Sequence, residues 1–199
     1  MGCKAPSPFF QGGMAMRATI AFIAVLAMVT VASAGENEGA TVSMKPMETT
    51  FLHPGDEVNV EIYGSGLVNA KGFWVVVEYD TDYLEYVDVG TAVYTGGLFD
   101  PAKGTLTPGV SLAGNTVELG AAFVSGGASG DGLLGKLKFK VSEGATSGDV
   151  FVKVNIAKFQ NQDGTWDEWR PPRLVATLVK VRLVAAEEAT WGEVKARMR

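Results

Sequence analysis

Few side chains in this sequence have the types and the spacing that catalysis needs. The chain of 199 residues holds one histidine, His53, and one cysteine, Cys3. His53 directly precedes Pro54 in an expected turn, and no Ser or Cys stands at a spacing that indicates a nucleophile–base pair. A single cysteine excludes a thiolate-rich zinc site and an intrachain disulfide. We therefore expect no catalytic residue, no metal site and no cofactor, and we predict that the protein is not an enzyme.

Carboxylate side chains occur in pairs, but their positions fit turns better than catalysis. Asp80 and Asp82 flank an expected turn, where aspartate is common, and a small domain without an evident cleft lacks the place for two opposed glycosidase carboxylates. The segment from Asn161 to Glu168 resembles a calcium loop, yet its spacing puts Phe159 where the first ligand belongs. We expect a hairpin turn in this segment.

Aromatic side chains near the end of the chain are the best candidates for binding a sugar. Trp166 and Trp169, together with Phe159, offer flat apolar faces on which sugar rings stack, and charged neighbours offer hydrogen bonds to hydroxyl groups. The alternative is a long hairpin whose tryptophans pack on the edge of the domain. The formal charge of −5 gives no general attraction to nucleic acid or to anionic membranes.

The start of the chain has the features of a secretory signal peptide. Arg17 precedes an apolar run over Ala18–Val31, and Ala32-Ser33-Ala34 follows it as an A-x-A cleavage pattern. The run has about 14 residues, fewer than the ~20 that a membrane-spanning helix needs. We expect residues 1–34 to be a leader that is cleaved after Ala34. The protein is then secreted or displayed on the surface of a bacterium, without a membrane span or a thiol.

The rest of the chain reads as strands separated by turns. Apolar residues occupy every second position in Glu57–Tyr63, and Gly114-Asn115 is typical of a two-residue hairpin turn. Most of the 25 glycines fall at such turns, and we expect Gly64-Ser65-Gly66 to interrupt a strand and Ser125–Gly132 to form a loop. About nine short strands predict an all-β fold, an antiparallel β-sandwich over residues 35–184.

Residues 185–199 are expected to form a separate tail. Thr190 and Glu193 have the spacing of a capping box, which predicts a short helix at the C-terminal end of the chain. A helix of this length is too short to be stable alone, so we expect it to dock on the domain, bind a partner or fray.

Three motifs in the chain occur in the order that is found in cohesin modules. Pro54-Gly55-Asp56 opens a strand, Gly72–Asp80 reads GFWVVVEYD, and Gly132–Val141 reads GLLGKLKFKV. Residues 40–181 therefore resemble the cohesin family. The resemblance implies a nine-stranded sandwich of jelly-roll topology that is not catalytic. It also implies binding to dockerin modules on secreted partner proteins, often enzymes that degrade polysaccharides.

Two other functions remain open beside the dockerin-binding one. The fold is shared with cellulose-binding modules, so a carbohydrate-binding module with polysaccharide as its partner is one alternative. A structural or adhesive domain of the cell surface is another. Fold alone does not decide among these functions.

Alternation within two of the motifs assigns side chains to faces. In the segment 72–80 it places Trp74, Val76 and Glu78 outward, and the core-facing residues are Phe73, Val75, Val77 and Tyr79. In the segment 133–141 it places Leu133, Leu137, Phe139 and Val141 inward, and the outward residues are Leu134, Lys136, Lys138 and Lys140.

The resemblance also implies that these two strands lie side by side in the sheet that faces the dockerin. One partner-binding face would then unite an apolar anchor with a charged surround, formed by Trp74, Val76, Glu78, Lys136 and Lys138. The alternative is that a loop covers Trp74 and that the lysines only keep a sheet face soluble.

Overall fold

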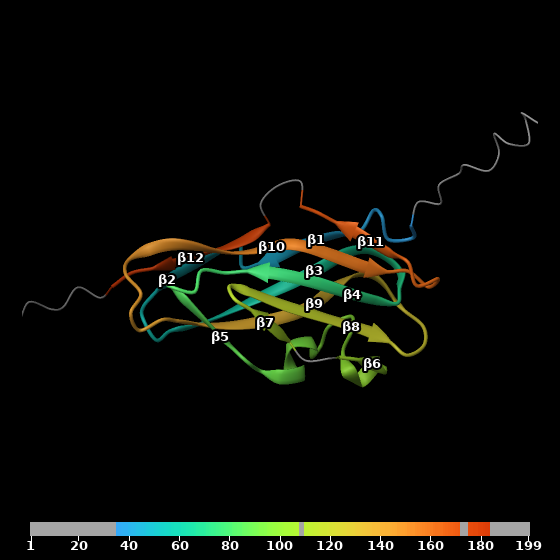
Figure 1. The fold of residues 1–199 in the computed structure, drawn as a ribbon, viewed down its shortest axis with the longest axis horizontal. Coiled ribbons are helices and arrows are strands. Elements are labelled where there is room, and N and C mark those ends of the chain that lie inside the picture. The colour runs from blue at the N-terminus through green and yellow to red at the C-terminus, as the bar shows by residue number, and fades with distance from the viewer. Residues whose placement is uncertain (1–34, 108–109, 172–174, 184–199) are drawn as a thin grey trace, which may run out of the picture. The chain divides into compact units, whose positions relative to one another are not determined.

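The chain forms two β-sheets that pack face to face (Figure 1). The computed structural model describes residues 35–107, 110–171 and 175–183. Twelve strands and two short 3-10 helices, η1 (Gly90–Tyr94) and η2 (Pro101–Lys103), occur within these ranges. The expected leader at 1–34 and the expected helix in 185–199 lie outside the described residues.

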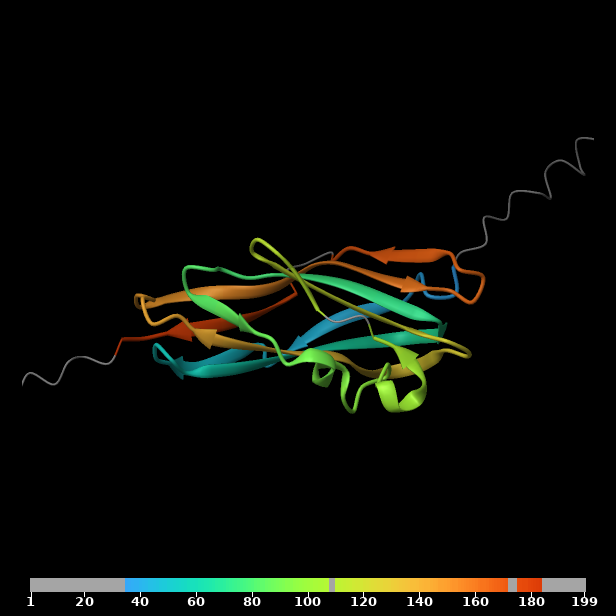
Figure 2. The same cartoon turned by 60° about the horizontal axis from the view of Figure 1, so that its bottom comes forward.

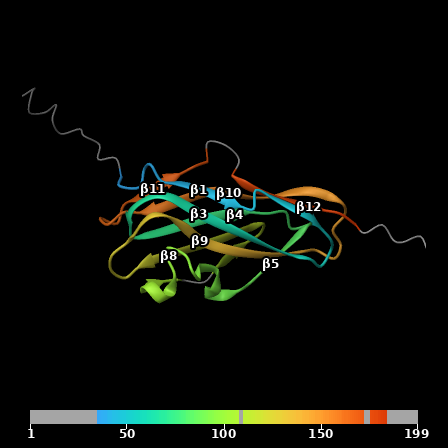
Figure 3. The ribbon, with the colours of Figure 1, turned by 180° about the vertical axis from the view of Figure 1, so that it is seen from behind.

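The smaller sheet, which we call the four-strand sheet, faces the viewer in Figure 3. Its strand order is β1-β3-β9-β5, with bounds Thr41–Lys45, Glu57–Ala70, Ala128–Val141 and Leu84–Val87. All of its strand pairs are antiparallel.

The larger sheet, which we call the eight-strand sheet, faces the viewer in Figure 1. Its strand order is β2-β12-β10-β4-β8-β6, with bounds Glu48–Leu52, Ala176–Val181, Gly148–Gln160, Gly72–Glu78, Thr116–Phe123 and Thr105–Leu106. At its margins β11 (Trp166–Trp169) pairs with β10, and β7 (Ser111–Ala113) pairs with β8. The β2–β12 pair is parallel, which departs from the expectation of a purely antiparallel sandwich.

The core lies between the two sheets, which Figure 2 shows as stacked layers. Every second residue of the central strands is buried, as alternation in a two-layer sandwich requires. From the four-strand sheet the buried set includes Val60, Ile62, Leu137 and Phe139, and from the eight-strand sheet it includes Phe73, Val75, Val77 and Phe159. The predicted all-β sandwich is confirmed. No helix in the described part of the chain is long and apolar enough to cross a membrane.

Strands β3 and β9 are longer than the sequence predicts. Gly64-Ser65-Gly66 does not interrupt β3, and β9 begins at Ala128 inside the expected loop. The two strands pair along their length, with register shifts near Gly64 and Leu67. Gly66 and Gly130 adopt positive φ, at 73° and 86°, a conformation that suits glycine at bulges. The glycines therefore bend a continuous ladder where the sequence suggested a break.

A bulge in β9 changes which leucine enters the core. Ile62 pairs with Gly135 whereas Tyr63 pairs with Leu133, so Leu134 is an extra residue in β9. Leu134 is fully buried and Leu133 is half-buried. The expectation that Leu134 points outward and Leu133 inward was wrong, because one inserted residue reverses the alternation on its N-terminal side.

Strands β4 and β9 lie in opposite sheets, which corrects the expectation that they are neighbours. β4 lies between β10 and β8, and β9 lies between β3 and β5. The chain crosses between the sheets in one step at Lys71, after Asn69 with a positive φ of 46°. Lys71 donates its backbone N–H to Gln160 and accepts from Phe123, which fixes this corner to the eight-strand sheet.

Candidate functional site

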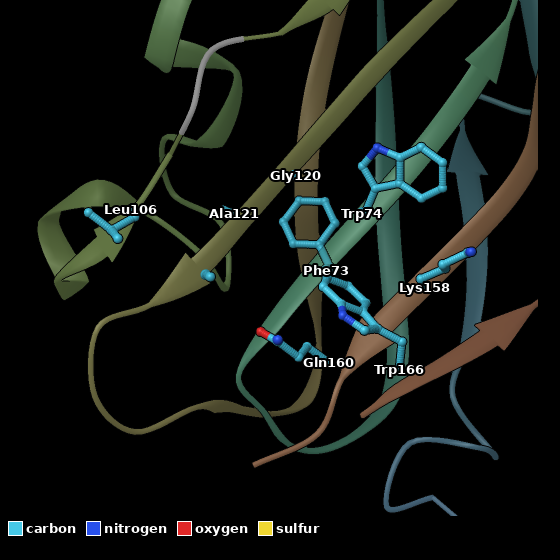
Figure 4. A pocket seen from close by; sticks show the side chains of 9 residues that line it. Phe73, Trp74, Leu106, Gly120, Ala121, Lys158, Gln160 and Trp166 are labelled. Atoms are coloured by element: carbon cyan, nitrogen blue, oxygen red, sulfur yellow. The ribbon is translucent and has the colours of Figure 1, made fainter. Parts of the chain in front are cut away.

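The outer face of the eight-strand sheet carries an open hollow of about 650 Å³, which we call the tryptophan groove (Figure 4). Side chains from β4, β6, β10 and β11 surround it, and β8 forms part of its floor. The lining residues are Phe73, Trp74, Leu106, Gly120, Ala121, Ala122, Lys158, Gln160 and Trp166.

Small residues on β4 and β8 explain why the sheet is hollow at this point. Gly120 stands opposite Trp74, and Ala122 stands opposite Gly72. A Cβ on Gly120 would lie 2.8 Å from the carbonyl oxygen of Phe73, closer than real Cβ contacts allow. The floor is therefore backbone and small side chains, while the tryptophans and Leu106 rise around it.

A buried tyrosine holds the backbone of the floor in place. Gly120 lies on β8 between the stretch that pairs with β7 and the stretch that pairs with β6. On the side of β8 away from β4, its backbone N–H and C=O therefore lack a strand partner. The hydroxyl of Tyr94 donates to Gly120 O at 2.8 Å and lies 3.1 Å from Gly120 N, so it can also accept from that N–H. Tyr94 thus satisfies backbone groups that would otherwise be costly to bury. Burial raises the pKa of Tyr94 and keeps this hydroxyl protonated.

The charges around the groove are paired with one another. Lys158 Nζ lies 5.4 Å from the ring centroid of Trp74 and 2.9 Å from Glu168 Oε2. Arg170 Nε contacts the other oxygen of Glu168 at 2.6 Å. The hydrogen bond from Lys158, with a further one from Arg170, lowers the pKa of Glu168. The result is an apolar hollow beside charges that are paired with one another.

Trp74, Val76 and Glu78 share the outer face of the eight-strand sheet, as the sequence predicts. All three are half-buried and alternate with buried neighbours. Glu78 accepts from Asn155 Nδ2 at 2.8 Å and pairs with Lys153 Nζ at 2.9 Å, and both contacts lower its pKa. Trp74 lines the open groove, so the alternative of a loop-covered tryptophan is not what the structure shows.

Lys136 and Lys138 do not join that surface, because they lie on the outer face of the four-strand sheet. Lys136 Nζ pairs with Glu61 at 2.7 Å, and Lys138 Nζ pairs with Glu57 at 2.6 Å. The five residues expected on one face are therefore divided between two opposite faces of the sandwich. The physical reason is the sheet assignment of β4 and β9, which alternation within a strand does not determine.

The aromatic candidates for sugar binding also separate. Trp166 is 46% exposed and lines the tryptophan groove, whereas Trp169 is partly buried against the core. Phe159 is fully buried on the inner side of β10 and has no face to offer a ligand. Trp166 therefore joins Trp74 in one groove, an arrangement that the sequence did not reveal.

Of the residues around the groove, Trp74 and Trp166 were predicted from the sequence as binding candidates, whereas the small floor residues, Leu106 and Lys158 were not. Alternation along the expected strand Thr116–Phe123 places Gly120 and Ala122 on one face, and two small residues at this spacing were a usable signal. No sequence signal brings Lys158 or Leu106 to the same place, because that depends on which strands pair.

The loop after β10 is a hairpin turn, as predicted. Gly164 has a φ of 88° and donates to Asn161 O at 3.0 Å. One carboxylate oxygen of Asp163 accepts both from the hydroxyl and from the backbone N–H of Thr165, which lowers the pKa of Asp163.

Within the described ranges no three His, Cys, Asp or Glu side chains gather as metal ligands. His53 Nδ1 lies 2.7 Å from Arg182 O, a contact that ties the first turn to the end of β12.

Comparison with known families and structures gives a consistent pattern. The sequence profile of the Cohesin domain family matches residues 41–168. A cohesin module of a family 33 glycoside hydrolase from Clostridium perfringens is 13% identical, with a TM-score of 0.55, and the match covers 73% of this chain and 96% of that one. The seventh ScaB type I cohesin of Pseudobacteroides cellulosolvens is 16% identical, with a TM-score of 0.53 and coverage of 75% and 96%.

A third similar structure was determined with a bound partner. The sixth cohesin of scaffoldin B from Acetivibrio cellulolyticus, in complex with a mutant Cel5 dockerin, is 19% identical, with a TM-score of 0.52. The match covers 73% of this chain and 99% of that one. No curated protein sequence matches the chain.

Proposed function

The chain belongs to the cohesin domain family, and from this premise we propose that it is a secreted, non-catalytic module that binds a dockerin-type domain through the tryptophan groove. The observation that carries the proposal is the groove itself, where Trp74 and Trp166 flank a floor of small residues on the outer face of the eight-strand sheet. Aromatic anchors in a partly enclosed hollow are the usual centres of binding energy in protein interfaces.

The groove fits an apolar side chain that projects from a partner helix or loop. Leu106, Ala122 and the two tryptophans offer apolar contact, while Lys158 and Gln160 offer hydrogen bonds at the margin. Because Lys158 is already paired with Glu168, the partner need not supply a charge to neutralise it. Burial of the apolar hollow is then the main favourable term in the free energy of binding.

A role in polysaccharide degradation is the finer part of the proposal. One similar cohesin module comes from a glycoside hydrolase, and another was crystallised with a Cel5 dockerin. We propose that the dockerin-type partner of this chain likewise belongs to a secreted protein that acts on polysaccharide, and that the leader directs the chain to the same compartment.

The test measures the affinity for dockerin domains encoded in the genome that encodes this chain. Trp74→Ala should raise the Kd at least about 30-fold, the loss expected for an interfacial hot spot. Lys136→Ala is the matched control, since it removes a charge from the opposite sheet and should leave the Kd within about twofold. Binding that Trp74→Ala leaves intact would overturn the groove assignment, and a failure of all dockerins to bind would overturn the function.

Carbohydrate binding is the second candidate, and the exposure of Trp166 favours it. An exposed indole beside Gln160 and Lys158 can stack on a sugar ring and hold its hydroxyls. Retention on insoluble polysaccharide that is lost in Trp166→Ala but kept in Trp169→Ala would support this candidate. Absence of retention, together with absence of dockerin binding, would favour a structural or adhesive role.

A further inference from the structure

The segment Gly35–Ala40 is fastened to one end of the sandwich by a buried asparagine. Asn37 is 2% exposed, and its side-chain Nδ2 donates to Asn161 Oδ1 at 2.7 Å and to Val68 O at 3.2 Å. Its Oδ1 accepts from Val68 N at 2.9 Å. We call this arrangement the Asn37 clasp. It joins the segment before β1 to β3 and to the turn after β10.

Asp167 on β11 completes the clasp with one of its two carboxylate oxygens. Oδ2 accepts from the backbone N–H of Asn37 at 2.9 Å and from Asn161 Nδ2 at 2.8 Å. Oδ1 faces Gly35, and it is the atom nearest to where a methyl group on Gly35 would stand. Such a methyl would overlap the carboxylate, so the backbone of Gly35 lies directly against Asp167.

Asp167 has no cationic partner in the described part of the chain. The ion pairs found there involve other acidic residues. The neighbouring Glu168 forms ion pairs with both Lys158 and Arg170 on the opposite face of β11. The other charged groups in the segment that faces Asp167 are Glu36 and Glu38, which are exposed and negative. A negative group among neutral donors and acidic neighbours favours a cation beside it.

We propose that cleavage between Ala34 and Gly35 supplies this cation, as an α-ammonium group on Gly35 that pairs with Asp167. Hydrolysis adds water across the peptide bond, so that Ala34 gains a carboxylate and Gly35 gains an amine that takes up a proton. The agent is an endopeptidase that accepts small residues at the positions of Ala32 and Ala34. The new end of the chain then becomes part of the folded domain.

The sequence pattern and the position of Gly35 both fit cleavage at this bond. A residue retained ahead of Gly35 would carry the ammonium group away from Asp167, and a side chain at position 35 would overlap the carboxylate. Since Asp167 is adjacent to Trp166, the pair also holds the strand that forms one wall of the tryptophan groove. The proposal needs the leader to be removed but does not depend on what the groove binds.

The test uses the protein secreted from its full-length sequence. N-terminal sequencing should identify Gly35 as the first residue. The rate of labelling by an aldehyde selective for α-amines is then followed against pH, because only the neutral amine reacts. An ion pair within about 4–6 Å raises the pKa of the amine above its ordinary value of about 7.7–8.0. A rise of about one unit makes labelling at neutral pH about tenfold slower than in Asp167→Asn.

Matched forms separate the ion pair from a general effect of charge or folding. Glu38→Gln removes an exposed charge from the same segment and should label as slowly as the unchanged protein. A form that keeps one extra alanine ahead of Gly35 leaves Asp167 intact and should label about tenfold faster. Another N-terminal residue, or equal labelling rates in the unchanged protein and the extended form, would overturn the proposal even if Asp167→Asn fails to fold.

Discussion

Gly120 shapes the tryptophan groove through the side chain that it lacks. Its position opposite Trp74 leaves space for the indole to line a hollow, and its backbone is held by the hydroxyl of Tyr94. The contact that forbids a larger residue is with backbone, the carbonyl of Phe73, which cannot rotate away as a side chain can. Stability and binding geometry therefore depend on the same glycine.

Gly120→Ala is expected to destabilise the fold by about 1–3 kcal/mol, the range for overpacking a closely fitted site. Its methyl would stand 2.8 Å from Phe73 O and push β8 away from β4. Urea unfolding measures the loss. Gly144→Ala is the control, because a Cβ there meets no atom within 4 Å, and its stability should stay within about 0.5 kcal/mol. Equal stabilities of the two variants would contradict the close contact at Gly120.

At the level of elements, the bulge in β9 determines which side chains enter the core. Leu134 fills space that Gly64 leaves open, since a Cβ on Gly64 would come within 3.1 Å of Leu134 Cδ2. The two residues lie on paired strands, so the bulge in β9 and the glycine in β3 are one structural feature. Leu133, one residue earlier, lies outside the fully buried set.

Leu134→Ala should lower the free energy of unfolding by about 2–5 kcal/mol, because it leaves a cavity in the core. Leu133→Ala, at a half-buried position, should cost clearly less. Guanidinium unfolding of both variants measures the difference. The opposite order would mean that β9 keeps a regular alternation and has no bulge at this point.

Alternation and turn residues predict most strands of this fold, and the reasons for the failures are physical. A period of two places Phe73, Val75 and Val77 correctly in the core, because it is a local property of an extended chain. The bulge at Leu134 and the sheet that each strand joins are not local, since they depend on pairing with distant strands. The groove could not be predicted for the same reason. Trp74 and Trp166 line one groove only because β4, β10 and β11 are neighbours.

At the scale of the whole molecule, the two outer faces of the sandwich differ in character. The four-strand sheet presents ion pairs, in which the hydrogen bond from Lys136 is the largest cause that lowers the pKa of Glu61. The eight-strand sheet also carries ion pairs, such as Lys158–Glu168, and it carries the apolar tryptophan groove in addition. Exposed ion pairs contribute little to stability, and we propose that a partner contacts the groove rather than these ion pairs.

The buried tyrosine hydroxyls are expected to make the stability of the fold fall as the pH rises into the alkaline range. Burial, with the nearby Asp88 carboxylate, raises the pKa of Tyr86 to about 12. A raised pKa means that the unfolded chain loses its proton first, near pH 10, whereas the folded chain keeps it. The contribution of Tyr86 is therefore complete below about pH 10 and is lost as the pH rises toward about 12.

Thermal unfolding at a series of pH values should show this loss, and Tyr86→Phe should reduce it. The ring still packs on Phe139, whose centroid lies 5.9 Å away, and the hydroxyl meets no hydrogen-bond partner among the described residues. The variant should thus match the unchanged protein near neutral pH and exceed its stability above about pH 10. Tyr83→Phe is the matched variant that removes a hydroxyl near the surface, beside Thr146, in place of a buried one. A slope that Tyr86→Phe does not alter would show that other groups, Tyr94 first among them, carry the alkaline loss of stability.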